Sequence, residues 1–91
     1  MKNGEVRKIY YSNYFYVALN KIPEKAKMDF LKKESFFIGN PFHPSLRTHK
    51  LHGKYKEYSA FTVTGQYRIM FTFSNEKFVD FVNIGTHEIY K

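Results

Sequence analysis

The sequence YSAFTVTGQYRIMFTFSNEKFVDFVNI, residues 58–84, carries the clearest structural pattern in the chain. Apolar and polar residues alternate along it, which is typical of strands that bury one face. Two short turn sequences, Thr64-Gly65-Gln66 and Ser74-Asn75-Glu76, interrupt the alternation. Turns this short join neighbouring antiparallel strands, so the pattern predicts a three-stranded meander. Its expected strands are 58–63, 67–73 and 77–84.

The middle strand has one apolar face and one mixed face. The apolar face holds Tyr67, Ile69, Phe71 and Phe73, and the mixed face holds Arg68, Met70 and Thr72. An arginine within a strand must reach water, a partner or an anion, because arginine is rarely buried alone. The sequence leaves two interpretations of Arg68. It clamps a phosphate with its guanidinium fork, or it forms a salt bridge across the sheet to Glu57 or Asp80.

Upstream of the meander, the pattern becomes that of one strand and two helices. Residues 5–11 are rich in Val, Ile and Tyr and predict a first strand. Ser12 or Asn13 can cap a first helix, and Pro23 fits the first position of a second helix, where a missing N–H costs nothing. The first helix is expected to reach Lys21 and to bury Phe15, Ala18, Leu19 and Ile22. The second is expected to bury Ala26, Phe30 and Phe37, with Leu31 alongside, and to end at Gly39-Asn40-Pro41.

Together these elements predict an α+β fold. The two helices form a hairpin, and the N-terminal strand joins the meander in one sheet that the helices cover on one face. Residues 41–56 form an irregular segment between the helices and the meander, anchored by Phe42, Leu46 and Leu51. The other face of the sheet need not be apolar, and it can display Arg68.

Length and composition predict one small domain, residues 1–91. Two independent cores are not expected in 91 residues, whereas 43% hydrophobic residues, with ten Phe and eight Tyr, can fill one core. The absence of cysteine excludes disulfides and thiolate catalysis and fits a cytoplasmic location. No apolar run is long enough to span a membrane, and the first five residues lack the apolar stretch of a signal peptide.

The net charge of +7 is concentrated in one window of the sequence. No acid occurs between Glu34 and Glu57. The window contains the cations Arg47, Lys50, Lys54 and Lys56 and the histidines His43, His49 and His52. Aromatic residues lie among them, and such a stretch can neutralise phosphates and stack on bases. A solvated loop whose cations aid solubility is the alternative, and the charge pattern alone favours neither.

Histidines supply the candidate acid–base groups. His49 and His52 have an H-x-x-H spacing, but no Cys, Asp or Glu lies close by to complete a metal site, so no metal or other cofactor is expected. His43 and His52 are interpreted as exposed loop residues. His49 and His87 remain candidates for general acid or base, because histidine commonly titrates near neutral pH.

The C-terminal residues 84–91 read IGTHEIYK and place His87 and Tyr90 just beyond a strand. A frayed tail with Tyr90 packed on the core is the alternative to a site there. The chain has no G-x-S-x-G motif, phosphate-binding glycine loop or paired carboxylates. The remaining His, Arg, Lys and Tyr side chains suit metal-independent RNA cleavage. One group accepts the 2′-OH proton, a cation stabilises the phosphorane, and another group protonates the leaving 5′-oxygen.

Three segments resemble motifs of the RelE/ParE superfamily of toxins. Residues 40–53, NPFHPSLRTHKLHG, resemble its NP…P-L-x-x-H-x-L-x-G segment. Residues 67–71, YRIMF, resemble its Y-R-I-x-F/Y strand, and residues 84–90, IGTHEIY, its terminal I-G-T-H-x-x-[YF]. Their order and spacing agree along essentially the whole chain, and the resemblance is greatest to the YafQ-like branch of bacterial toxin–antitoxin systems.

The resemblance implies a ribosome-dependent mRNA endoribonuclease that cleaves mRNA in the ribosomal A site and is neutralised by a cognate antitoxin. It implies an active site on the concave face of the sheet, formed by His49, Arg68, His87 and Tyr90. His49 and His87 are then the acid–base candidates, Arg68 contacts the scissile phosphate, and Tyr90 stacks on a base or orients the phosphate. The expected RNA-backbone contacts are Arg47, Lys50, Lys54 and Lys56.

The sequence also departs from the family pattern. Thr62 and Gln66 stand where YafQ-like enzymes have a further His and an Asp, and Ser59 and Phe61 stand where RelE has lysines. Glu57 is a candidate substitute base. Two alternatives follow: a ParE-like toxin that inhibits DNA gyrase, or a catalytically degenerate member that only binds RNA or its antitoxin.

Overall fold

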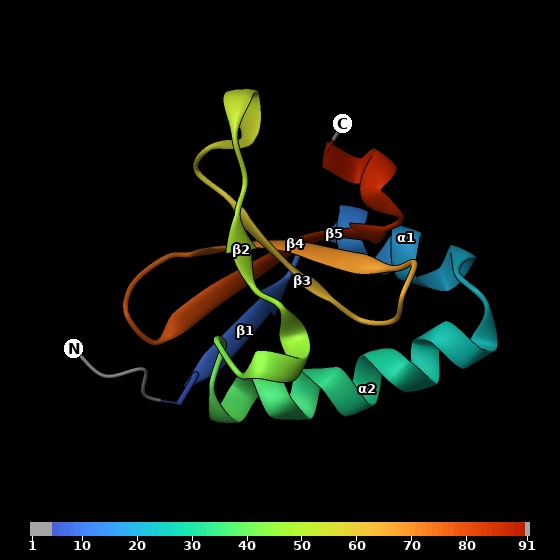
Figure 1. Cartoon of the computed structure of the whole chain (residues 1–91), viewed down its shortest axis with the longest axis horizontal. Helices are drawn as coiled ribbons and strands as arrows, with labels where there is room; N and C mark the ends of the chain where they lie inside the picture. Colours follow the sequence, from blue (N-terminus) through green and yellow to red (C-terminus); the bar gives the residue numbers. More distant parts are fainter. Residues whose placement is uncertain (1–4, 91) are drawn as a thin grey trace.

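The computed structural model describes residues 5–90, which form a five-stranded mixed sheet with two helices packed on one face (Figure 1). The strands are β1 (Lys8–Tyr11), β2 (His49–Lys50), β3 (Ser59–Thr62), β4 (Arg68–Phe73) and β5 (Phe78–Gly85). The helices are α1 (Asn13–Lys21) and α2 (Glu24–Gly39), and the 3-10 turns are η1 (Pro44–Leu46), η2 (Gly53–Tyr55) and η3 (His87–Tyr90). The strand order is β1-β5-β4-β3-β2.

The predicted antiparallel meander is confirmed, and the sheet extends beyond it on both sides. β3 pairs with β4 and β4 with β5, both antiparallel. β1 pairs with β5 in parallel, and the long connection that a parallel pair requires runs through α1, α2 and the strands β2, β3 and β4. The interpretation of residues 41–56 as wholly irregular is wrong, because β2 pairs antiparallel with β3 and η1 and η2 flank it.

The helices begin and end close to the predicted positions. Ser12 caps α1, since its hydroxyl accepts a hydrogen bond from the backbone N–H of Phe15 at 2.9 Å. Pro23 is the N-cap of α2 and not its first helical residue, so that prediction is wrong by one position. Leu31 does not share the buried stripe of α2, because it is 63% exposed.

The main core lies between the helices and one face of the sheet. Its largest fully buried side chains are five phenylalanines: Phe15, Phe37, Phe61, Phe71 and Phe81. Phe37 of α2 occupies the middle of this set, stacked on Phe61 at 4.8 Å and edge-on to Phe71 at 5.0 Å between ring centroids. Aromatic pairs of this kind add stability beyond the area they bury, so this face holds the fold together.

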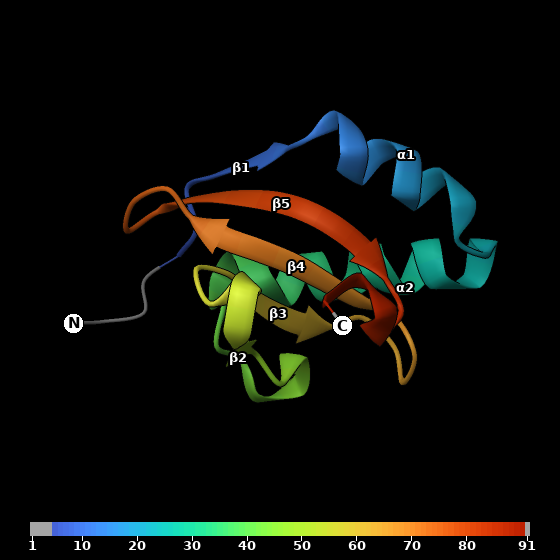
Figure 2. The same cartoon turned by 90° about the horizontal axis from the view of Figure 1, so that it is seen from above.

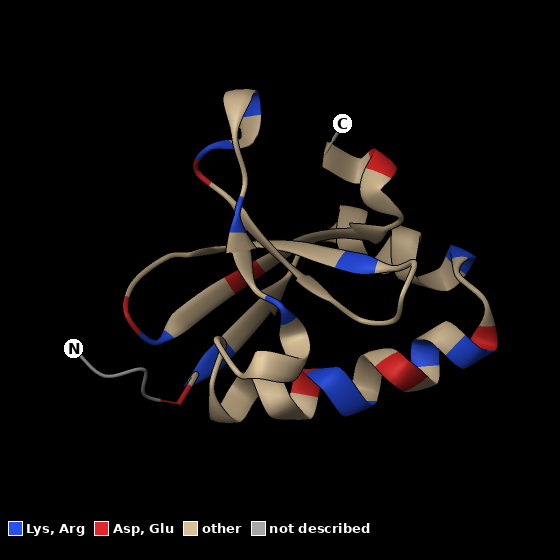
Figure 3. Ribbon diagram, viewed as in Figure 1, with Lys and Arg blue, Asp and Glu red and all other residues tan. Residues whose placement is uncertain are grey.

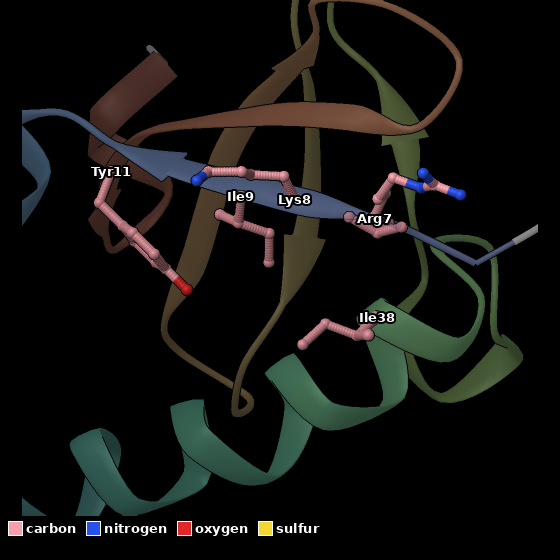
Figure 4. A pocket seen from close by; sticks show the side chains of 6 residues that line it. Arg7, Lys8, Ile9, Tyr11 and Ile38 are labelled. Atoms are coloured by element: carbon pink, nitrogen blue, oxygen red, sulfur yellow. The ribbon is translucent and has the colours of Figure 1, made fainter.

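β1 is tied to α2 by a polar pair and by a small cavity. The Tyr11 hydroxyl donates a hydrogen bond to the Glu34 carboxylate. Burial, followed by this bond, raises the pKa of Tyr11, and burial raises the pKa of Glu34 while the bond opposes that rise. Figure 4 shows Ile9 and Tyr11 pointing from β1 toward α2 around a cavity of about 150 Å³, with Ile38 opposite. These contacts fix the edge strand against the helical layer.

A second, smaller apolar cluster lies on the opposite face of the sheet. Leu51, Ala60 and Met70 form its buried centre, and Tyr55, Tyr58, Val82, Ile89 and Tyr90 pack around them. Figure 2 looks onto this face, with α2 behind the strands. None of the helices within residues 5–90 is both long enough and apolar enough to cross a membrane.

Candidate functional site

The sheet face opposite α1 and α2, here called the open face, gathers most of the predicted site residues. The segment that contains β2 and η2 and the C-terminal turn η3 both rise on this side of the sheet (Figure 1). The second apolar cluster joins them, because Tyr55 of η2 and Ile89 and Tyr90 of η3 pack against the same buried residues. The segment with β2 and η2 and the turn η3 therefore both project from the open face, which is formed by β3, β4 and β5.

His49 stands on the open face at the edge strand β2. It lies opposite Ala60, a member of the second cluster, so both side chains point to the same side of the sheet. The ring is exposed, its Nδ1 lies 3.1 Å from the carbonyl oxygen of Arg47, and its centroid is 6.3 Å from that of Tyr90. The contact with Tyr90 joins two predicted site residues that are 41 positions apart in the sequence.

Arg68 begins β4 and lies between Thr62 of β3 and Gly85 of β5. Its Nη1 donates to the carbonyl oxygen of Gln66 at 3.4 Å, a long bond that leaves most of the guanidinium donors available. The alternative of a salt bridge to Glu57 or Asp80 is wrong, since no ion pair within residues 5–90 includes Arg68.

The turn η3 folds back over the end of β5 and positions His87 and Tyr90. Gly85 permits this fold, because a Cβ atom there would lie 2.6 Å from Cγ2 of Ile89. His87 is exposed, with its Nε2 3.8 Å from a carboxylate oxygen of Glu88. Tyr90 is half-buried and packs against the second cluster, as the alternative expected, but it does so from the ordered turn η3. No hydrogen bond or ion pair joins His49, Arg68 and His87 to one another within the described residues.

The basic window surrounds β2 and η2. Figure 3 shows Lys and Arg along this rising segment. Arg47, Lys50, Lys54 and Lys56 are all exposed. Arg47 adopts a left-handed backbone with φ of 52°, which non-glycine residues rarely adopt, and so it turns the chain into β2. Lys54 lies over the ring of Tyr55, 5.3 Å from its centroid.

Other residues singled out in the sequence occupy different places. Glu57 lies beside Thr72, whose hydroxyl donates to its carbonyl oxygen at 3.0 Å. Thr72 is four residues from Arg68, or about 13 Å along β4, so Glu57 lies away from the guanidinium. His52 is exposed as expected, whereas His43 is half-buried, stacks on Phe36 at 4.7 Å and caps η1.

The structure shows where the residues that depart from the family pattern lie relative to Arg68 and the open face. Thr62 lies directly across from Arg68 on β3, and Gln66 provides the carbonyl group that Arg68 contacts. Phe61 is fully buried in the main core, so a side chain at that position points away from the open face. The residues of β3 that face the open side are Ala60 and Thr62, by the strict alternation of a strand.

Two aromatic residues of this region were not predicted as site residues. Phe42 was expected to anchor the segment, but it is 51% exposed, and Phe73 of β4 is 39% exposed. Their rings stack with centroids 6.3 Å apart. The sequence signal that could have indicated the exposure of Phe73 is its position at the end of the strand, where the helices no longer cover the sheet.

Residues 5–90 contain no group of three or more His, Asp or Glu side chains placed to hold one metal ion. The functional groups on and around the open face are therefore exposed imidazoles, a guanidinium, a phenol and lysine amines. Such groups can bind a phosphodiester, exchange protons with it and stabilise negative charge on it.

No protein-family model matches the sequence, and no curated protein matches it. Solved structures do resemble it. The structure of the Escherichia coli DinJ–YafQ toxin–antitoxin complex contains a chain that is 24% identical, with a TM-score of 0.68, covering 91% of this chain and 94% of that one. The Mycobacterium tuberculosis RelBE2 toxin–antitoxin complex gives 13% identity, a TM-score of 0.76 and coverage of 93% and 94%.

A YoeB/ParE toxin from Agrobacterium tumefaciens is 12% identical, with a TM-score of 0.74, covering 89% of this chain and 99% of its own. The chain therefore has the RelE/ParE-like toxin fold, as its three motifs predicted. Among these three structures, the sequence identity is highest to the YafQ complex, in agreement with the resemblance to that branch. At these identities the likeness establishes the fold, whereas the chemistry depends on the side chains of the open face.

Proposed function

We propose that this protein is the toxin of a type II toxin–antitoxin system, an endoribonuclease that cleaves mRNA in the ribosomal A site. The observation that carries the proposal is the contact between the rings of His49 and Tyr90 over the open face. Arg68 stands on the same face, at the start of β4. His49 lies opposite Ala60 and Arg68 opposite Thr62, two residues further along β3. Strand geometry then separates their Cα atoms by about 12 Å, so that both side chains can reach one phosphate.

The proposed reaction needs only the protein's own side chains. A general base accepts the proton of the 2′-OH, whose oxygen attacks the adjacent phosphorus. Arg68 stabilises the charge that develops on the phosphorane, and a general acid protonates the 5′-oxygen as the P–O5′ bond breaks. The products are a 2′,3′-cyclic phosphate and a 5′-hydroxyl. His49 and His87 are the acid–base pair, and no cofactor is required.

The remaining residues of the open face position the RNA. Tyr90 offers a half-buried ring for stacking on a base or for orienting the phosphate. Arg47, Lys50, Lys54 and Lys56 contact the RNA backbone, which gives an affinity that falls as salt concentration rises. The ribosome presents the mRNA as a single strand, the form in which these stacking and phosphate contacts are available.

The partner that restrains the protein is an acidic antitoxin segment that folds on binding to the basic surface. Two of the similar structures are toxin–antitoxin complexes, which supports such a partner here. The three similar chains match 89–93% of this chain and 94–99% of their own length, which supports one toxin domain over residues 1–91. The proposed location is the cytoplasm, where translating ribosomes are found.

The test is primer extension on an abundant translated mRNA, before and after the protein is induced without its antitoxin. New 5′ ends in register with the reading frame are expected for the wild type and are expected to be absent for Arg68→Ala and His87→Ala. Both variants should retain antitoxin binding. Growth arrest with intact mRNA would indicate a gyrase-directed toxin instead, and neither arrest nor cleavage would indicate a degenerate member.

A further inference from the structure

A cavity lies beside the open face and is lined by His49, which also belongs to that face. The cavity has a volume of about 470 Å³, within the range of roughly 300–1,000 Å³ that small-ligand sites occupy. Its walls come from the segment between α2 and β2, from β2 itself, from the start of β3 and the residues before it, and from the end of β4. The residues that line it include Phe42, His49, Lys50, Glu57, Thr72 and Phe73.

The apolar part of this cavity is held in place although it faces solvent. Phe42 and Phe73 stack with an angle of 27° between their ring planes. The backbone N–H of Phe42 donates to Oδ1 of Asn40 at 2.9 Å, and Thr48 donates to the carbonyl oxygen of Pro41 at 2.5 Å. Phe73 also lies edge-on to the core residue Phe71, with 5.5 Å between ring centroids, yet both Phe42 and Phe73 remain exposed. An exposed pair of rings held in this way provides a platform for a planar ligand.

The polar part of the cavity carries both signs of charge. His49 and Lys50 stand on β2, and both are exposed. Glu57 lines the same cavity, and the bond from the Thr72 hydroxyl to its carbonyl oxygen fixes its backbone. A cation beside an aromatic platform suits a nucleotide, whose phosphate is anionic and whose base is planar. A carboxylate accepts hydrogen bonds from the amino group of adenine or cytosine, which uracil lacks.

We infer that this cavity is a subsite for one unstacked base of the RNA, adjacent to the phosphate that is cleaved at the open face. The base stacks on Phe42 or Phe73, its amino group donates to the Glu57 carboxylate, and Lys50 contacts the neighbouring phosphate. His49 connects this subsite to the cleavage site because it lines the cavity and also contacts Tyr90. The inference rests on the proposed function, since it names the RNA feature that the enzyme selects: a base with an exocyclic amino group.

The experiment measures binding without cleavage. The full-length protein is titrated with the 2′-O-methyl trinucleotides AAA and UUU, which cannot be cleaved, and its backbone amide NMR signals are followed. AAA should shift the signals of Phe42, Lys50 and Phe73, and it should bind about tenfold more tightly than UUU. Phe42→Ala should weaken AAA binding about tenfold, whereas Tyr14→Ala, which removes an exposed ring from α1, should leave it unchanged.

Glu57→Gln tests the selectivity separately from the stacking. It should reduce the preference for AAA over UUU, whereas Glu76→Gln, at an exposed position in the β4–β5 turn, should retain it. Equal binding of AAA and UUU by the wild type would overturn the inference. So would shifts confined to Arg68, His87 and Tyr90, although these would leave the proposed function standing.

Two further outcomes separate the inference from the function on which it rests. The absence of shifts with either trinucleotide at millimolar concentration, together with intact mRNA in the primer extension assay, would overturn both. If an acidic, phenylalanine-containing peptide shifted Phe42 and Phe73 while neither RNA did, the cavity would be assigned to a protein partner and the inference would fail.

Discussion

The two faces of the sheet share one backbone but differ in what their side chains do. The helix-covered face buries five phenylalanines completely, and the polar pair Tyr11–Glu34 joins β1 to α2 on this side. The open face buries the smaller cluster of Leu51, Ala60 and Met70 and leaves His49 and His87 exposed. Adjacent residues of β4 belong to opposite faces: Ile69 to the main core and Arg68 and Met70 to the open side.

This difference indicates that stability and function are largely separate in the molecule. A change on the helix-covered face should alter the free energy of unfolding, whereas a change on the open face should alter RNA cleavage or binding. Gly85 and Arg47 are exceptions to this separation. Each has a backbone conformation or close contact that positions site residues, so a change at either can affect both folding and function. Substitutions on each face can therefore test whether stability and function are separate.

The largest expected effect is that of Phe37→Ala on the helix-covered face. Phe37 is fully buried among Phe61, Phe71 and Phe81, so its removal leaves a cavity that the rigid sheet cannot fill. The free energy of unfolding should fall by about 3–5 kcal/mol in urea denaturation. Tyr14→Ala, at a 67% exposed position, should change it by less than about 0.5 kcal/mol. A loss below about 1 kcal/mol for Phe37→Ala would contradict the assignment of the core.

Gly85→Ala tests the boundary between the faces. The new methyl group would approach Cγ2 of Ile89 to 2.6 Å, so η3 has to move and takes His87 and Tyr90 with it. Cleavage of ribosome-bound mRNA should slow by about 10- to 100-fold, because small displacements of catalytic groups are costly. Gly39→Ala is the matched control, since a Cβ atom there meets nothing within 4 Å. Equal cleavage rates for the two variants would show that the position of η3 does not affect activity, which would contradict the prediction.

The pair Tyr11–Glu34 predicts a pH dependence that belongs to the helix-covered face. Both pKa values are raised by burial, so the folded state binds these protons more tightly than the unfolded chain does. Their stabilising contribution is complete at low pH. It declines as the pH rises above the ordinary Glu pKa of about 4.3, through the raised pKa of Glu34, and declines again above about pH 10 as the tyrosine of the unfolded chain ionises.

Substitution of either partner should isolate this dependence. In a comparison of urea denaturation across the pH range, Glu34→Gln should remove the acidic part of the decline and Tyr11→Phe the alkaline part. Cleavage activity at neutral pH should change little in either variant if its unfolding free energy suffices to keep it folded. Identical pH profiles for the wild type and both variants would mean that the pair does not couple protons to folding.

The smallest expected effect is that of Arg47→Gly, and its two readouts have opposite signs. Glycine accepts the left-handed backbone of residue 47 without strain, so the free energy of unfolding should rise by about 0.5 kcal/mol. The lost cation should weaken RNA binding and reduce the slope of log affinity against log salt by about 0.7. An unchanged salt slope would show that Arg47 makes no phosphate contact.

The meander and the helical hairpin could be predicted because their signals are local. Alternating residues such as Ile69 and Phe71, short turns and a capping Ser12 each act over a few positions, and all are present in the structure. β2 could not be predicted in the same way. It consists of two residues, His49 and Lys50, and its pairing with β3 depends on tertiary contacts that a local pattern does not encode.

The candidate site shows the same limit. The motifs proposed His49, Arg68, His87 and Tyr90, but only the folded chain could show that His49 meets Tyr90 and that Glu57 lies beside Thr72. An extra residue in β5, opposite the junction of Met70 and Phe71, also shifts the register, and alternation alone gives no sign of it. The exposed pair Phe42 and Phe73 looked like core in the sequence, because hydrophobicity does not reveal where the covering helices stop.

The most direct test of the central claim is single-turnover cleavage of mRNA on programmed ribosomes by the purified protein. Two messages are compared, one natural and one with a single 2′-deoxynucleotide at each position of the A-site codon in turn. Cleavage of the natural message to a 2′,3′-cyclic phosphate, and its loss when the attacking 2′-OH is missing, is the predicted result. Intact natural mRNA in the presence of folded wild-type protein, or cleavage that persists without the 2′-OH, would contradict the account.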